Sequence, residues 1–192
     1  MLSIIIPSKN EKDVGNMVRS TRQMFPMADI VLIEDTEGKG KGHTLRKGLE
    51  TAEGDTICFI DGDIDIHPAE IHNLLPYLTY YDVVIGIKRL DRLPPRRKLV
   101  SFGYRLLVRF LFRVHISDTQ TGLKLWKRDR IPDFKTDGFA YDIEMLVKAR
   151  KAKLRIKEVP IRCRIYSKVK ISSIFKTLGE TLRIWIDHSF RS

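Results

Sequence analysis

The sequence has little cysteine and no long apolar run. Cys58 and Cys163 are the two cysteines among 192 residues, and both lie in apolar or alternating stretches. A disulfide framework is therefore not expected, and this usage is typical of a reducing compartment. No apolar run approaches the ~20 residues of a membrane span, and no secretory signal precedes the strand-like sequence that begins at Leu2. We expect a cytoplasmic protein that can touch the cytoplasmic face of a membrane without crossing it.

Low-complexity tracts are also absent from the sequence, and so are internal repeats other than a regular spacing of short apolar runs. With 43% hydrophobic and 31% charged residues, the chain resembles neither a disordered tail nor a set of membrane spans. Its length is that of one compact domain with a core of its own.

The charge is unevenly distributed along the chain. Residues 1–87 carry a net charge of −6 and residues 88–192 a net charge of +17, which gives +11 in total. This asymmetry suggests a cation site in the first half and an anionic partner for the second. Nucleic acid, a phosphorylated substrate and an anionic membrane all remain possible partners on this evidence.

Four short apolar runs, recurring about every 27 residues, predict buried parallel strands at residues 2–6, 30–33, 57–60 and 83–87. The spacing leaves room for one helix in each gap, as in repeated βαβ units. We therefore expect an α/β fold, an open, mostly parallel sheet with helices on both faces. Ligands bind such sheets beyond the carboxyl ends of the strands. Polar residues cluster after all four runs: Lys9, Asn10, Glu11, Glu34, Asp35, Asp61, Asp63, Asp65, Lys88 and Arg89.

The first motif at these ends is the acidic segment D-G-D-I-D at residues 61–65. Alternate carboxylates at a strand end can coordinate a hard divalent cation such as Mg²⁺ or Mn²⁺, and the cation can bridge a diphosphate. A solvated acidic loop is the alternative interpretation. We favour a metal site formed by Asp61, Asp63 and Asp65, because the motif lies at the edge of the sheet where ligands are expected.

The second motif is G-K-G-K-G at residues 38–42, which runs into a helix predicted near His43. Glycines let backbone amides approach a phosphate, and the amino terminus of a helix favours an anion. The motif matches neither a Walker loop nor a dinucleotide fingerprint. Lys41 is a candidate contact for a nucleotide sugar, and a flexible connector explains the glycines equally well.

The basic half predicts two amphipathic helices. In the first, about residues 97–114, the arginines at 97, 105, 109 and 113 form a stripe beside large apolar residues. A helix near 141–151 and an alternating segment at 154–165 follow a polar loop at 117–122. The last helix has a predicted apolar stripe at 171, 174, 175, 178, 182 and 185, with 176, 180, 183 and 187 opposite. Such helices lie on anionic membranes; a core helix with a solvated basic face is the alternative.

Several segments taken together resemble the family 2 glycosyltransferases of GT-A fold, and among them the polyprenyl-phosphate hexosyltransferases. The matching segments are S-I-I-I-P-S-K-N-E at 3–11, D-G-D at 61–63 with H-P at 67–68, S-D-T-Q-T-G-L-K at 117–124, F-A-Y-D-I-E-M-L at 139–146 and E-V-P-I at 158–161. The resemblance makes residues 1–170 the catalytic domain, including the first amphipathic helix, and residues 171–192 a C-terminal amphipathic helix.

The resemblance also implies roles for individual residues. Those matching the nucleotide and diphosphate contacts are Pro7, Lys9, Glu11, Glu34, Asp35, Asp61 and Asp63, with Asp65 as a further metal ligand. Those matching the acceptor-phosphate contacts are Arg97 and Ser101, and Lys88 or Arg89 matches the basic residue after the fourth strand, also among the catalytic candidates. The sugar pocket matches Gln120, Thr121 and Gly122, and a basic pair near phosphate matches Arg164 and Lys168.

Two features of the family are missing. Between Asp35 and Gly40 the family has a further helix and strand of some 20 residues, so we expect the sheet to lack an edge strand. The transmembrane helices common in the group are also absent from this sequence. Attachment to an anionic membrane would then depend on the two amphipathic helices.

The implied reaction is metal-dependent, inverting transfer of a hexose from GDP-mannose or UDP-glucose to a polyprenyl or dolichyl phosphate. A lipid phosphate is already an anion at neutral pH, so the acceptor needs positioning by guanidinium groups such as that of Arg97 and no general base. We therefore expect Asp142 and Glu144 to serve helix solubility.

Two other functions are alternatives. A nucleic-acid-binding module would explain the basic half, but the basic residues share their helices with large apolar faces and no known binding signature occurs. We therefore expect no nucleic acid partner. A sugar-phosphate nucleotidylyltransferase would need a glycine-rich opening after the first strand, which this sequence lacks.

Overall fold

A computed structural model describes residues 1–63, 65–88, 95–112, 116–117, 121–163 and 171–190. Within these residues, no helix combines the length and the apolar character that crossing a membrane requires.

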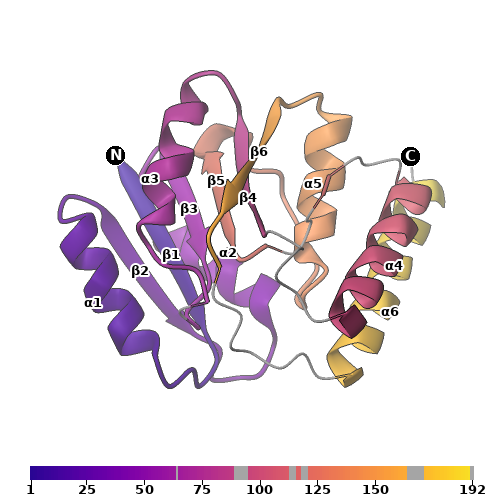
Figure 1. Cartoon of the computed structure of the whole chain (residues 1–192). Coiled ribbons are helices and arrows are strands. Elements are labelled where there is room, and N and C mark those ends of the chain that lie inside the picture. Colours follow the sequence, from indigo (N-terminus) through magenta and orange to yellow (C-terminus); the bar gives the residue numbers. More distant parts are fainter. Residues whose placement is uncertain (64, 89–94, 113–115, 118–120, 164–170, 191–192) are drawn as a thin grey trace.

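The core of the fold is a six-stranded sheet with the order β2-β1-β3-β5-β4-β6 (Figure 1). Its strands are β1 (Leu2–Ser8), β2 (Asp29–Glu34), β3 (Thr56–Ile60), β4 (Val83–Lys88), β5 (Leu123–Lys127) and β6 (Ile156–Ile161). All neighbouring pairs are parallel except the two that involve β5. The predicted open, mostly parallel α/β sheet and the four predicted strands are thus confirmed.

The antiparallel strand β5 had not been predicted. It separates β3 from β4, so the fourth predicted strand is not a direct neighbour of the third. Lys124 and Lys127 break its apolar run, which is why the sequence showed no strand there. Lys124 is nevertheless 1% exposed, and the neighbouring Trp126 is fully buried.

Helices cover both faces of the sheet (Figure 1). On one face, α1 (Val14–Met24) and α3 (Glu70–Leu74), which continues into the 3-10 helix η1 (Leu75–Thr79), pack on Ile4, Ile6 and Ile60. On the other face, α2 (Lys41–Thr51) and α5 (Tyr141–Lys151) pack on the alternate residues Ile5 and Phe59. This alternation is the period of two that a sheet buried on both faces requires. A short 3-10 helix, η3 (Arg128–Arg130), follows β5.

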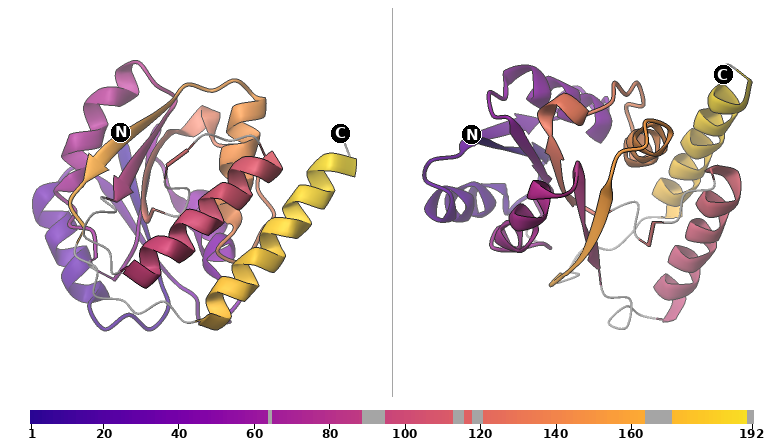
Figure 2. Two further views of the ribbon diagram at one scale, coloured as in Figure 1. Left: turned by 45° about the vertical axis from the view of Figure 1, so that its right-hand side comes forward. Right: turned by 90° about the horizontal axis from the view of Figure 1, so that it is seen from above.

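The helices α4 (Pro95–Phe112) and α6 (Ile171–Phe190) lie side by side beyond α5 (Figures 1 and 2). Val108 of α4 packs on Ile143 and Val147 of α5. Tyr104 of α4 and Thr181 of α6 are joined by a hydrogen bond of 2.9 Å. The two amphipathic helices predicted from the sequence therefore exist and form a pair.

The sequence left open which side of α6 packs on the domain. Among the residues of α6 whose side chains the structure describes, Thr177, Thr181 and Ile184 are buried, whereas Leu182 of the predicted apolar stripe is 45% exposed. Glu180, which lies opposite that stripe, accepts a hydrogen bond from the backbone N–H of Ala140 at 3.0 Å. The sequence pattern shows that α6 is amphipathic, but it does not show which face packs on the domain.

The segment that follows β2 is short, as predicted. Among the described strands, β2 pairs with β1 alone and therefore lies at an edge of the sheet. Residues 35–40 lead directly into α2. The chain thus has no further strand between Asp35 and Gly40.

Candidate functional site

The carboxyl ends of β1, β3 and their neighbours bring the predicted residues to one edge of the sheet, which we call the rim. It comprises residues 7–11 at the end of β1, 34–35 at the end of β2, 61–63 and 65 after β3, and the amino terminus of α2 at Lys41. Lys88, the last residue of β4, is close enough for its charge to act on Asp61. Segments far apart in the sequence therefore meet at the rim.

The turn after β1 is held by Glu11. Its carboxylate accepts hydrogen bonds from the Ser8 hydroxyl at 2.7 Å and from the backbone N–H of Lys9. Asn10 adopts a positive φ of 57°, a conformation that asparagine tolerates better than most residues. Pro7 is buried at the end of β1 and lies opposite Ile33 of β2. Glu11 therefore shapes this turn, whatever else it contacts.

Asp35 is committed to the loop that precedes α2. Its side chain is 4% exposed, and its two carboxylate oxygens accept from the backbone N–H groups of Lys39 at 2.8 Å and Gly40 at 3.0 Å. The ammonium of Lys9 lies 3.7 Å away. Glu34, the other predicted acid, is exposed. Asp35 therefore fixes the conformation of the short loop between β2 and α2. This loop stands where the family has a further helix and strand.

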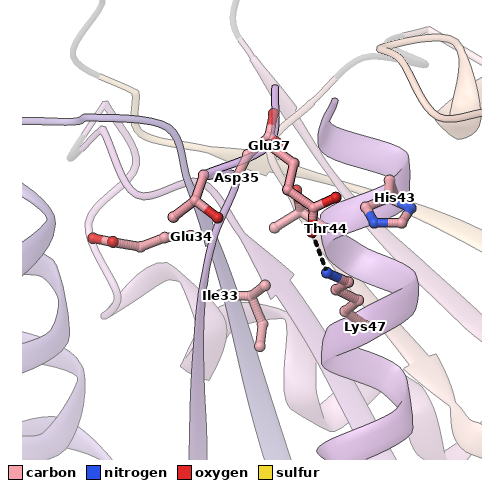
Figure 3. Close-up of a pocket in the computed structure, with 8 residues that line it drawn as sticks. Ile33, Glu34, Asp35, Glu37, His43, Thr44 and Lys47 are labelled. Atoms are coloured by element: carbon pink, nitrogen blue, oxygen red, sulfur yellow. Dashed lines mark hydrogen bonds and ion pairs between the residues drawn. The ribbon is translucent and has the colours of Figure 1, made fainter. Parts of the chain in front are cut away.

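A narrow pocket lies between the end of β2 and the start of α2 (Figure 3). Glu37 and Lys47 form an ion pair of 3.1 Å there, and Glu34 points away from Lys47. Hydrogen bonds from Lys39 and Lys47 lower the pKa of Glu37 to about 2. The buried Nε2 of His43 has no hydrogen-bond partner within the described part of the chain.

The first carboxylate of the D-G-D motif is paired with a lysine. Lys41 and Asp61 form an ion pair, and the Lys41 ammonium lies 5.7 Å from the centre of the Tyr141 ring. Burial raises the pKa of Asp61, but the charge of Lys41 and its hydrogen bond outweigh burial, so the pKa falls below its usual value. The backbone N–H of Asp61 donates to the Gly122 carbonyl at 3.0 Å. Asp61 is thus held by groups from α2 and from the start of β5.

The second carboxylate, Asp63, forms no ion pair with a lysine or arginine among the residues that the structure describes. Burial and the negative charges of Asp61 and Asp65 raise its pKa to about 6. Asp65 is buried, and its backbone N–H donates to Asp63 Oδ1 at 3.2 Å. Crowded carboxylates of this kind favour a cation.

The metal assignment of Asp61, Asp63 and Asp65 stays a prediction. Within the described residues, no three histidine, cysteine, aspartate or glutamate side chains are grouped as the ligands of one metal ion. Mg²⁺ commonly binds through one or two carboxylates together with substrate phosphates and water. The rim fits that kind of site, with Asp63 as the principal protein ligand, and not a complete protein cage.

The glycine-rich segment has a structural explanation. The backbone N–H groups of Gly42 and His43 donate to the carbonyl oxygen of Asp137 at 2.7 and 3.2 Å. A Cβ on Gly42 would lie 2.0 Å from the Thr136 carbonyl, and one on Gly40 would lie 2.5 Å from the Asp137 carbonyl. The glycines therefore allow the 136–138 loop to pack on the start of α2, and two of the amides proposed for phosphate already have a partner.

Sequence reasoning missed a buried ion pair behind the rim. Lys124 Nζ lies 2.7 Å from Asp142 Oδ1, and the two side chains are 1% and 4% exposed. Asp142 was expected to serve helix solubility, as was Glu144, which is 6% exposed and accepts from the backbone N–H groups of Lys135 and Thr136. Both expectations are wrong, because the first turn of α5 faces the domain. The sequence did offer one sign of this ion pair, because Lys124 stands inside an otherwise apolar run.

Several predicted contacts lie outside the described residues: Arg89, Gln120, Arg164 and Lys168. Arg97 and Ser101 fall on the first turns of α4, and their side chains also lie outside the description. Thr121 and Gly122 are buried at the start of β5, next to Asp61. The structure thus brings together those residues assigned to the donor that it describes at the rim, and all of the assigned roles stay predictions.

Comparison with known proteins agrees with the fold and the motifs. The profile described as "Glycosyltransferase like family 2" matches residues 2–162. Glycosyltransferase AglD of Haloferax volcanii is 29% identical over 96% of this chain and 37% of its own length. A dolichyl-phosphate beta-glucosyltransferase of Trichomonas vaginalis, ALG5A, is 28% identical over 96% of this chain and 62% of its own length. The chain therefore spans between about a third and two thirds of these two relatives.

Solved structures show the same fold. Glucosyl-3-phosphoglycerate synthase from Mycobacterium tuberculosis, in complex with Mn²⁺, UDP and phosphoglyceric acid, superposes with a TM-score of 0.79 at 18% identity, over 96% of this chain and 78% of that one. Mannosyl-3-phosphoglycerate synthase from Rubrobacter xylanophilus gives a TM-score of 0.77 at 15% identity, over 100% of this chain and 74% of that one.

Proposed function

The chain belongs to glycosyltransferase family 2, and on that premise we propose that it transfers a hexose from a nucleoside diphosphate sugar to a polyprenyl phosphate at a membrane surface. We take UDP-glucose as the first donor to test and GDP-mannose as the second. The names of the dolichyl-phosphate beta-glucosyltransferase relatives favour glucose and a lipid phosphate. The observation that carries the proposal is the rim, where Lys41 neutralises Asp61, whereas Asp63 forms no ion pair with any described lysine or arginine and has a raised pKa.

On the donor side, the diphosphate would lie over the ends of β1 and β3. Lys41, Asp61 and Asp63 are close together there, so the rim offers both an ammonium and an open carboxylate. A divalent cation held by Asp63 would supply Lewis-acid stabilisation of the leaving diphosphate. Asp61, already bound to Lys41, would orient that lysine toward the phosphates. Thr121 and Gly122 would form the wall of the sugar pocket next to Asp61.

On the nucleobase side, the shortened connection after β2 limits what the chain can offer. Asp35 is buried against the backbone of residues 39 and 40, so its carboxylate has little capacity left for a base. Lys9 and Glu34 are exposed at the same rim and remain available. We propose that the donor is recognised mainly through its diphosphate and sugar, and that base selectivity is modest.

On the acceptor side, the pair of α4 and α6 presents an unusual outer face, which we call the α4–α6 face. Its exposed apolar side chains are Phe102, Leu106 and Phe110 on α4 and Leu182 and Ile186 on α6, each between 45% and 82% exposed. They recur at intervals of four on each helix, opposite the residues that pack on the domain. Exposed arginines such as Arg109 and Arg183 lie on the same helices.

Apolar residues beside cationic ones favour the interface of an anionic membrane. A lipid acceptor would present its phosphate at that interface, and Arg97 and Ser101 are proposed to bind it at the start of α4. The acceptor phosphate is then the nucleophile and would attack the anomeric carbon with inversion, without a general base.

The test is transfer of radiolabelled sugar from UDP-glucose and from GDP-mannose to a polyprenyl phosphate in anionic vesicles, with Mn²⁺, with Mg²⁺ and with chelator. Label that enters the organic phase only with metal supports the proposal and identifies the donor. A parallel arm offers a water-soluble phosphorylated acceptor without lipid. If sugar is transferred to the water-soluble acceptor and not to the lipid, the lipid acceptor is refuted, whereas the assignment as a glycosyltransferase stands.

A further inference from the structure

A buried ion pair lies directly behind the rim. The Lys124 ammonium on β5 and the Asp142 carboxylate in the first turn of α5 are 2.7 Å apart and almost fully shielded from water. A buried charge is costly unless it is paired, and removing one partner strands the other. Burial raises the pKa of Asp142, and the charges of Lys124 and Lys41, together with hydrogen bonds from Lys124 and Tyr141, oppose that shift. The carboxylate therefore depends on nearby cations.

The pair is linked to the rim through the start of β5. Lys124 donates a hydrogen bond to the carbonyl oxygen of Thr121. The next residue, Gly122, accepts from the Asp61 N–H, and a Cβ on Gly122 would lie 2.1 Å from an Asp61 carboxylate oxygen. Moving Lys124 would therefore disturb the backbone on which Asp61 rests.

The pair is linked to the rim a second time through Lys41. The Lys41 ammonium faces the ring of Tyr141, the residue that precedes Asp142, and is bound to Asp61. Although burial lowers the pKa of Lys41, the charges of Asp61 and Asp142 outweigh it and keep the ammonium protonated. The charges of Lys124, Asp142, Lys41 and Asp61 thus alternate from the interior to the rim, and each carboxylate has one lysine.

We propose that Lys124 is a positioning residue for the donor site. By neutralising Asp142, it leaves Lys41 bound to Asp61, and this in turn leaves Asp63 as the carboxylate that is open to a cation. Without the Lys124 charge, the cation among the described residues whose charge still acts on Asp142 is Lys41. Lys41 is then drawn toward Asp142 to the extent that the carboxylate stays ionised. The inference rests on the proposed function only for its kinetic consequence.

The first experiment measures the position of Lys41 directly. Lysines are acetylated under limiting reagent and the extent at Lys41 is read by mass spectrometry in wild type, Lys124→Met and the double variant Lys124→Met with Asp142→Asn. In the single variant Lys41 moves inward, and its acetylation rate should fall about threefold or more. In the double variant Asp142 no longer attracts it, and the rate should return to that of wild type. Faster or unchanged acetylation in the single variant overturns the proposal, because simple loosening of the fold exposes Lys41.

The matched control is Lys127→Met. Lys127 lies on the same strand and pairs with Asp82 at 3.5 Å, at the end of the sheet remote from the rim. Asp82 keeps Arg155 as a second partner, so this variant strands no charge. Lys41 acetylation should be unchanged, and a change there would mean that any lysine lost from β5 disturbs the rim.

The second experiment measures Mn²⁺ binding without donor, by electron paramagnetic resonance of the free ion, beside the donor KM. In Lys124→Met, released Asp61 joins Asp63, so Mn²⁺ affinity should rise about fivefold. Loss of Lys41 from the rim should raise the donor KM about tenfold. A merely loosened site would weaken both, so opposite shifts identify positioning.

If Lys124→Met does not fold, Lys41→Met tests the same competition at the rim with the buried pair intact. Its Mn²⁺ affinity should also rise about fivefold, and an unchanged or lower affinity overturns the proposal. Neither acetylation nor Mn²⁺ binding requires transfer. If Lys41 acetylation and Mn²⁺ affinity shift as expected but the protein transfers no sugar, the role of Lys124 is supported and the proposed function is rejected.

Discussion

The rim and the α4–α6 face differ in how their exposed groups are satisfied. At and behind the rim, Lys41 pairs with Asp61 and Lys124 pairs with Asp142. Asp63 differs, because burial and its acidic neighbours raise its pKa. On the α4–α6 face, Phe110 is 82% exposed and nothing within the described residues covers it. Within the described parts of the chain, the rim thus lacks a cation beside Asp63, whereas the α4–α6 face lacks a cover for its apolar surface.

These two deficits are of different kinds and call for different partners. An excess of buried negative charge is relieved by a cation, over a distance of a few ångströms and with defined geometry. Exposed apolar area is relieved by any extended apolar phase, without defined geometry. We expect substitutions at the rim to abolish sugar transfer. Substitutions on the α4–α6 face should change only how much of the protein is bound to the membrane.

The largest expected effect is that of Asp63→Asn. Loss of the carboxylate removes the principal ligand for the cation, and transfer should fall about 10³-fold, as when a main electrostatic contact to a leaving group is lost. Sugar transfer at saturating donor is the measurement. Asp55→Asn is the control, because Asp55 is exposed and pairs with the amino terminus away from the rim, and it should leave transfer unchanged. Undiminished transfer in Asp63→Asn would contradict the metal assignment.

The next effect is on membrane binding by the α4–α6 face. Replacing Phe102, Leu106 and Phe110 together by serine removes three apolar anchors, and partition to anionic vesicles should weaken about 10²-fold. Co-sedimentation with vesicles measures it. Met27 and Tyr80 are also exposed, at 88% and 69%, but belong to other parts of the surface. Serine at these two positions should leave partition unchanged, and equal losses in both sets would refute a defined membrane face.

Most of the sheet could be predicted from the sequence because β1 to β4 are short apolar runs with a regular spacing. The strand β5 could not, since Lys124 and Lys127 interrupt its apolar pattern while Lys124 is in fact neutralised inside the protein. An ion pair between residues 18 positions apart leaves no local pattern. The packed side of α6 was left open for a related reason, because the described residues that face the domain include Glu180 and two threonines, whereas Leu182 and Ile186 are exposed.

The candidate site shows the same division. The residues at the ends of β1 and β3 could be located from the sequence because strand ends meet at one edge of a parallel sheet. The partners of those residues could not, since Asp35 binds the loop that replaces a missing helix and strand, and Lys41 binds Asp61 across 20 positions. The positions of the carboxylates could be predicted from the sequence. Which of them are already bound to other groups of the protein depends on packing, which the sequence does not show.

A smaller effect is expected where the 136–138 loop packs on the start of α2. Gly42→Ala places a methyl group against the Thr136 carbonyl, and it should lower the free energy of unfolding by about 2 kcal/mol. Gly103 on α4 has no atom within 4 Å of an added Cβ. Gly103→Ala should therefore raise stability by about 0.5 kcal/mol. Urea denaturation measures both, and equal changes would mean that the loop moves freely to accommodate Gly42→Ala.

The smallest effect concerns charges that are paired away from the rim. Hydrogen bonds from Arg155 lower the pKa of Asp82 to about 2, against about 4 for an aspartate in an unfolded chain. The ionised carboxylate therefore stabilises the fold above about pH 4, and this contribution is lost as the pH falls from about 4 to about 2. Because Arg155 is 61% exposed, water screens the pair, and the contribution should stay under about 1 kcal/mol. Urea denaturation of wild type and Asp82→Asn should show a difference at pH 6 that vanishes near pH 2. Sugar transfer at neutral pH should be equal in the two proteins, because this ion pair serves stability alone; a loss of transfer would mean that the charges at the two ends of the sheet are coupled.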